Sequence, residues 1–131
     1  MRLRSYLNRV YTVIDSRQEI LIESLRLLET VPDQEGLLEG RLRFWDGSLL
    51  EFVEVIIEQG VVLTKTDYAY HYQDAQASLI FRYDNAPHHP EIATYPHHKH
   101  TLSGIEPAAP PDFGDILREI DTHLYLPESQ K

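Results

Sequence analysis

Five of the seven histidines in this chain lie between Phe81 and His100, a segment broken by three prolines. The polar groups of this segment include His88, His89, His97, His98, His100, Arg82, Asp84 and Asn85. An imidazole changes its charge near neutral pH, and it is also the commonest metal ligand in proteins. A segment with this composition is therefore a candidate for proton transfer, metal binding or contact with a phosphate group.

Proton transfer is the first of these chemistries. Metal-independent cleavage of RNA needs a base for the 2′-hydroxyl, an acid for the leaving oxygen and a positive charge beside the phosphate. We assign the proton transfers to His88, His98 and His100. Arg82 or Lys99 would supply the positive charge. Substrate contacts are expected from neighbouring polar and aromatic side chains. These are His71, Tyr70, Asp84, Asn85 and Tyr95.

Metal binding is the alternative chemistry for the same histidines. Residues two apart in an extended chain point to one side, which suits His98 and His100, and a third ligand would come from His88 or His89. The chain has no cysteine and no HExxH motif, so its histidine spacing matches no established zinc site. We therefore expect no cofactor, and we keep a divalent metal such as zinc at His88, His98 and His100 as the alternative.

The formal net charge of −9 argues against general binding to the nucleic-acid backbone, because that binding depends on lysine and arginine neutralising phosphates. The histidine-rich segment is less acidic than this average, since Arg82 and Lys99 balance Asp84 and Glu91. An anion site is compatible with that balance. A second alternative is a non-catalytic interaction module that binds through its acidic surface and its arginine-bearing N-terminal segment.

Length and composition limit the class of protein. The 131 residues are enough for one domain, residues 1–131, with a hydrophobic core of its own. The lack of cysteine excludes disulfides and thiol nucleophiles. No apolar run is long enough to span a bilayer and no signal peptide is evident, so we expect a cytoplasmic protein without membrane contact.

The elements around the histidines must position them. Apolar residues at three- and four-residue spacing predict a helix over residues 2–15. Alternating apolar residues, separated by short turns such as Asp46-Gly47, then predict about five consecutive antiparallel strands. These strands cover residues 18–29, 38–45, 49–58, 61–73 and 79–84. A histidine-rich loop (84–100) and a C-terminal helix (113–124), capped by Asp112, complete an α+β fold with both helices on one face of the sheet.

Several strings of the sequence resemble one known family. They are DGSLLEF at 46–52, YHYQ at 70–73, LIFRYDNAPHHPE at 79–91 and PHHKH at 96–100. The chain resembles the TumE family of toxins from toxin–antitoxin pairs. The resemblance implies a growth-inhibiting protein whose partner is a small antitoxin, commonly one with a helix-turn-helix DNA-binding region. Many small toxins built from a sheet and flanking helices are ribonucleases, so RNA is the expected substrate by analogy of class.

Overall fold

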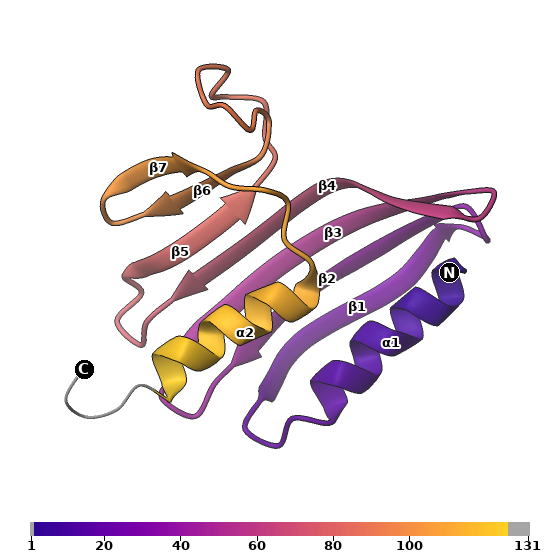
Figure 1. The fold of residues 1–131 in the computed structure, drawn as a ribbon. Coiled ribbons are helices and arrows are strands. Elements are labelled where there is room, and N and C mark those ends of the chain that lie inside the picture. Colours follow the sequence, from indigo (N-terminus) through magenta and orange to yellow (C-terminus); the bar gives the residue numbers. More distant parts are fainter. Residues whose placement is uncertain (1, 126–131) are drawn as a thin grey trace.

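The protein is a seven-stranded antiparallel sheet with one helix before it and one after it (Figure 1). The computed structural model describes residues 2–125. The elements are α1 (Leu3–Asp15), β1 (Leu21–Val31), β2 (Glu35–Arg43), β3 (Leu49–Gln59), β4 (Val62–Gln73), β5 (Leu79–Asp84), β6 (His98–Thr101), β7 (Gly104–Pro107) and α2 (Phe113–Leu124). The strands lie in the sheet in chain order, so each strand pairs with the next. The predicted α+β class and its two helices are confirmed.

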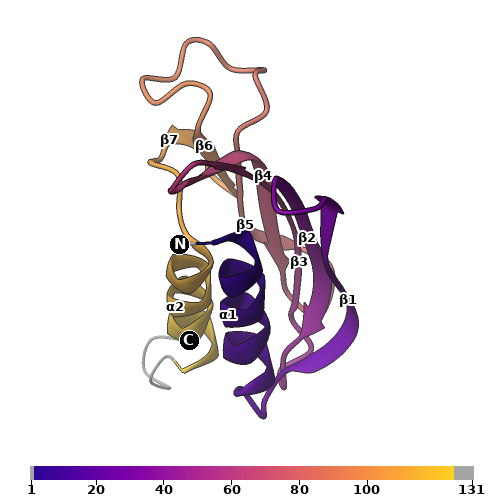
Figure 2. The ribbon, with the colours of Figure 1, turned by 90° about the vertical axis from the view of Figure 1, so that its right-hand side faces the viewer.

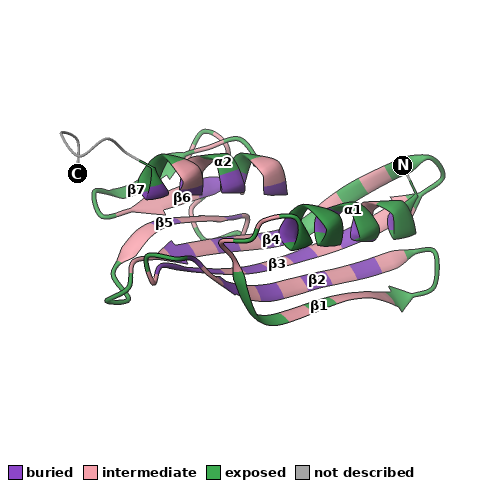
Figure 3. Ribbon diagram, turned by 90° about the horizontal axis from the view of Figure 1, so that it is seen from below, coloured by how far each residue is buried: buried purple, intermediate pink, exposed green. Residues whose placement is uncertain are grey.

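Both helices cover the same face of the sheet (Figure 2). Each helix is amphipathic and turns its apolar side toward the strands (Figure 3). The buried side chains are Leu3, Leu7, Val10 and Ile14 of α1 and Phe113, Ile116, Leu117, Ile120 and Leu124 of α2. The helix-facing side of the sheet is therefore the core side, and the opposite side is open.

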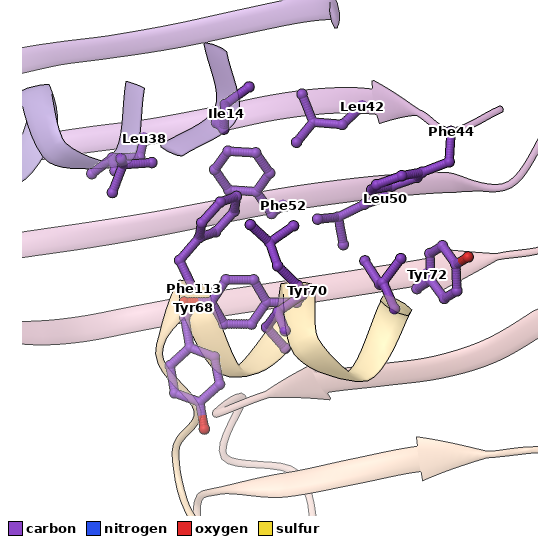
Figure 4. Packing of buried hydrophobic residues seen from close by; sticks show 14 of the residues in the cluster. Ile14, Leu38, Leu42, Phe44, Leu50, Phe52, Tyr68, Tyr70, Tyr72 and Phe113 are labelled. Atoms are coloured by element: carbon purple, nitrogen blue, oxygen red, sulfur yellow. The ribbon is translucent and has the colours of Figure 1, made fainter. Parts of the chain in front are cut away.

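Alternation along the strands decides which side chains enter this core. In β2 the buried residues Leu38 and Leu42 alternate with the half-buried Glu39 and Arg41. The core side of β3 and β4 adds large aromatic residues, and Phe52 packs on Phe113 of α2 with ring centroids 5.0 Å apart (Figure 4). Because the side-chain period of a strand is two, the residues between these core positions must lie on the open face.

Strands β6 and β7 were not predicted from the sequence, so the expected number of about five strands was too low. The segment expected as a loop to residue 100 becomes a strand at His98, and β7 follows it. Both strands have only four residues and lie among prolines; β6 is wholly polar and β7 has a single large apolar residue, so neither carries a readable apolar alternation. The proline that ends β7, Pro107, is tolerated because β7 is an edge strand. Within residues 2–125, no helix has the length and apolar character that crossing a bilayer requires.

Candidate functional site

Four polar side chains meet where β5 pairs with β6. Arg82 lies opposite His100, and Asp84 lies opposite His98. Cross-strand partners share a face of the sheet, and so do residues two apart on one strand. The four side chains therefore form a square on the open face, at the end of the sheet where β5 and β6 lie side by side (Figure 1).

Asp84 is the centre of this group. Its side chain is 7% exposed, and it accepts hydrogen bonds from Arg82 Nε at 3.0 Å and from the backbone N–H of Ala86 at 3.0 Å. The other carboxylate contacts are His98 Nε2 at 2.9 Å and His100 Nε2 at 3.5 Å. A buried carboxylate needs such partners, because transfer from water without them is strongly unfavourable. Asp84 consequently fixes the positions of three other side chains.

His98 is the buried histidine of this group and contacts Asp84. Its Nδ1 donates to the carbonyl oxygen of Pro96 at 2.8 Å, while its Nε2 faces Asp84. Because Pro96 O can only accept a hydrogen bond, the hydrogen on Nδ1 is assigned. The side chain is only 3% exposed. His98 is therefore placed to hold Asp84 rather than to touch a substrate.

The accessible members of the group are His100, Arg82 and His89. Their side chains are 27%, 40% and 28% exposed. His89 comes from the β5–β6 loop, and its ring centroid lies 5.9 Å from that of His100 and 5.1 Å from that of His98. Burial lowers the pKa of His100, and the nearby carboxylate of Asp84 only partly opposes this effect. At neutral pH the His100 ring is consequently a neutral imidazole that can accept a proton.

The same imidazoles are the residues that could hold a metal ion. One nitrogen each of His89, His98 and His100 lies within 4.8 Å of the other two. The loop turns His89 toward this group, whereas the expected third ligand, His88, is exposed and lies outside it. For a metal to bind, His98 Nε2 would have to face the ion instead of Asp84.

Two residues expected at the site lie on the other face of the sheet. Lys99 sits between His98 and His100 in β6, so its side chain points toward α2, where Nζ donates to Glu119 at 2.8 Å. Tyr70 is fully buried in the core and donates to Glu54, with Lys65 beside it. Alternation along the strands separates both side chains from the histidine group.

The remaining expected residues are placed as follows. Asn85 holds backbone in place, since Oδ1 accepts from the N–H of Tyr68 at 3.0 Å and Nδ2 donates to the carbonyl of Thr66 at 2.9 Å. Tyr95 is exposed in the β5–β6 loop. His71 lies on the open face, directly opposite Arg82 in the sheet register. Its Nδ1 is buried and has no hydrogen-bond partner among residues 2–125.

An open cavity of about 580 Å³ adjoins the histidine group on the open face. Its lining includes Arg82 and His71 together with Arg41 and Glu51, two residues that were not among the expected site residues. The register explains how they meet, because Arg41 pairs with Glu51, Glu51 with His71, and His71 with Arg82. Alternation showed which face each residue occupies, but only the pairing of the strands shows that they form one row.

The fold and this group of side chains define a small α+β protein with a polar site on the open face of its sheet. A family model described as Toxin TumE matches residues 10–124. The chain belongs to the TumE toxin family, the toxin component of a toxin–antitoxin system with a cognate antitoxin as its partner. Searches of curated proteins and of solved structures found no match.

Proposed function

We propose that this toxin is a metal-independent endoribonuclease with His100, Arg82 and His89 as its reacting groups. The observation that carries the proposal is the Asp84 centre, which holds Arg82, His98 and His100 in fixed positions. The buried Asp84–His98 pair serves as a rigid support, and Arg82, His100 and His89 lie beside it on the open face. A neutral base, a second imidazole and a permanent cation are the groups that transesterification of RNA requires.

Each group has a separate role in the proposed reaction. His100 takes the proton of the 2′-hydroxyl, and the 2′-oxygen then bonds to phosphorus. Arg82, whose Nε is held by Asp84, offers its terminal nitrogens to the phosphate oxygens. His89, with Nδ1 3.4 Å from Glu91, gives a proton to the 5′-oxygen as its bond to phosphorus breaks. The products are a 2′,3′-cyclic phosphate and a free 5′-hydroxyl.

This assignment refines the roles expected from the sequence. His98 remains part of the machinery as a positioning residue, because its burial prevents contact with RNA. His89 replaces His88 as the loop histidine, and Lys99 is committed to Glu119. Arg82 therefore supplies the positive charge.

The test is cleavage of RNA by the purified toxin and its variants. His100→Ala and Arg82→Ala should each lower the cleavage rate by about 10²–10⁴-fold, the usual contribution of a positioned acid–base group. His88→Ala is the matched control, because it removes an exposed histidine of the same loop and should leave the rate unchanged. Intact RNA with wild-type protein, or equal activity of all four proteins, would contradict the proposal.

A divalent-metal centre is the second candidate function, and one observation favours it. The hydrogen bond from His98 Nδ1 to the carbonyl oxygen of Pro96 orients the ring so that Nε2, once it has given up its proton, could bind a metal within the three-histidine group. Elemental analysis of protein purified without an affinity tag separates the two functions. One bound metal per chain, together with loss of activity in EDTA, would favour the metal centre over the metal-independent reaction.

A further inference from the structure

We infer that the cavity on the open face binds a nucleotide of single-stranded RNA next to the scissile phosphate. This inference rests on the proposed function and names the substrate site beside its reacting groups. Arg82 belongs to both places, because its Nε is held by Asp84 and its side chain also lines the cavity. A chain whose phosphate lies at Arg82 therefore has the cavity directly beside it.

The cavity runs across neighbouring strands rather than along one strand. The row that starts at Arg82 continues through His71 and Glu51 to Arg41 of β2, each residue paired with the next. Its volume of about 580 Å³ falls within the range of small-molecule sites. An extended nucleic-acid chain can follow such a row away from the histidine group.

The floor of the cavity suits a planar apolar group. The neighbouring row places Val53 beside Ala69, and both residues line the cavity. Their side chains are short and the polar side chains around them are longer, so these two residues form the floor of the cavity. A nucleobase can lie flat on such a floor. Burial of its face against aliphatic groups would stabilise the complex through the hydrophobic effect.

The walls carry hydrogen-bonding groups of the kinds that a nucleotide requires. His71 Nδ1 is buried without a partner in the described part of the chain, and an unpaired buried nitrogen is costly unless a ligand satisfies it. Arg41 is 43% exposed and is held by Glu51 at 3.0 Å, so its guanidinium is positioned while part of it stays open to solvent. His71 can therefore contact a base edge once its ring turns Nδ1 toward the cavity, and Arg41 can contact the next phosphate.

Binding of an uncleavable probe tests the inference independently of catalysis. The probe is a fluorescein-labelled single-stranded oligonucleotide with a 2′-O-methyl group on every sugar, so that no 2′-hydroxyl can react. Val53→Glu places a negative charge on the cavity floor and should weaken binding by about tenfold or more, because the charge repels the phosphates and removes the apolar contact of one base. Val55→Glu is the matched control, because Val55 lies on the same face of β3 and outside the cavity lining.

A second variant keeps the inference testable if Val53→Glu does not fold. Arg41→Ala changes an exposed side chain, and it should raise KM for RNA by about fivefold to tenfold while kcat stays within twofold, as for a residue that contributes binding alone. An equal effect of the two glutamate variants, or unchanged KM for Arg41→Ala, would overturn the inference.

The outcomes also separate this inference from the proposed function. If Val53→Glu weakens probe binding and Val55→Glu does not, but the wild-type protein cleaves no RNA, the nucleotide site is supported and the nuclease is rejected. If cleavage depends on His100 but Val53→Glu does not weaken probe binding, the nuclease function is supported and the nucleotide site in the cavity is rejected. If the purified antitoxin, and not the probe, loses affinity for the Val53→Glu protein, the face is an antitoxin surface and the inference is wrong.

Discussion

Replacement of Asp84 by alanine should destabilise the protein strongly, because this carboxylate satisfies several donors at once. His98, 2% exposed, and the backbone N–H of Ala86 would each lose an acceptor that water cannot readily replace. A buried donor left unpaired costs about 1–3 kcal/mol, and more when it is charged, so we expect a total loss of about 3–5 kcal/mol. Arg82 adds little to this total, since its side chain is 40% exposed and can turn to solvent.

Urea unfolding followed by circular dichroism measures this loss. The loss of about 3–5 kcal/mol would be a large part of the roughly 5–15 kcal/mol that stabilises a domain. In thermal unfolding it would lower Tm by about 10 °C or more. Asp67→Ala is the control, because Asp67 is an exposed carboxylate in β4 and its removal should cost less than about 0.5 kcal/mol.

A double-mutant cycle with His98→Ala isolates the pair itself. If Asp84 and His98 stabilise each other as their 2.9 Å contact indicates, the cycle should give a coupling energy of at least about 1.5 kcal/mol. Losses that add to within about 0.5 kcal/mol would refute the reasoning, since independent sites behave in that way.

Three further predictions follow from single positions. Burial lowers the pKa of His100, so the acidic limb of the kcat/KM profile, where this base becomes protonated, should lie below about pH 6.5; an acidic limb centred above about pH 6.5 would contradict this role. Gly40→Ala should cost about 1–3 kcal/mol in urea unfolding, because the added Cβ would lie 2.8 Å from a ring carbon of buried Phe52; an unchanged midpoint would show that the ring can move aside. Asp112→Ala should cost about 1 kcal/mol, since it removes the capping box that Asp112 forms with Asp115, and Asp112→Asn, which keeps a capping oxygen, should recover part of the loss.

Alternation in the sequence was sufficient to predict part of the site. The spacing of His98 and His100 correctly implied a shared side, and they share it because β6 is a strand. The same rule, applied to Lys99, places that side chain on the opposite face, so its exclusion from the site was predictable. Tyr70 and His71 are likewise adjacent in β4 and cannot share a face.

Other parts of the site depend on contacts that periodicity does not encode. Of the adjacent pair His88 and His89, the structure turns His89 toward the group, and the irregular path of the β5–β6 loop decides which one faces inward. The row from Arg41 to Arg82 required the register of four strands. That register includes irregular pairing near Val55 and Tyr72, where a shift of one residue would move side chains to the other face.

The acidity of the whole chain does not decide what binds at the open face. A charge is screened within about 8–10 Å at physiological ionic strength, so a ligand in the cavity responds mainly to the groups around it. Three arginines and two glutamates line the cavity, whereas the chain as a whole has a formal charge of −9. The glutamates also hold the arginines in place, as Glu51 holds Arg41. On the proposed function, such a toxin would bind RNA weakly through its general surface and firmly only where a phosphate reaches Arg82 and a base reaches the cavity. Discrimination would then come from the placement of a few groups rather than from net charge, and this is why the acidity of the sequence is compatible with a nuclease.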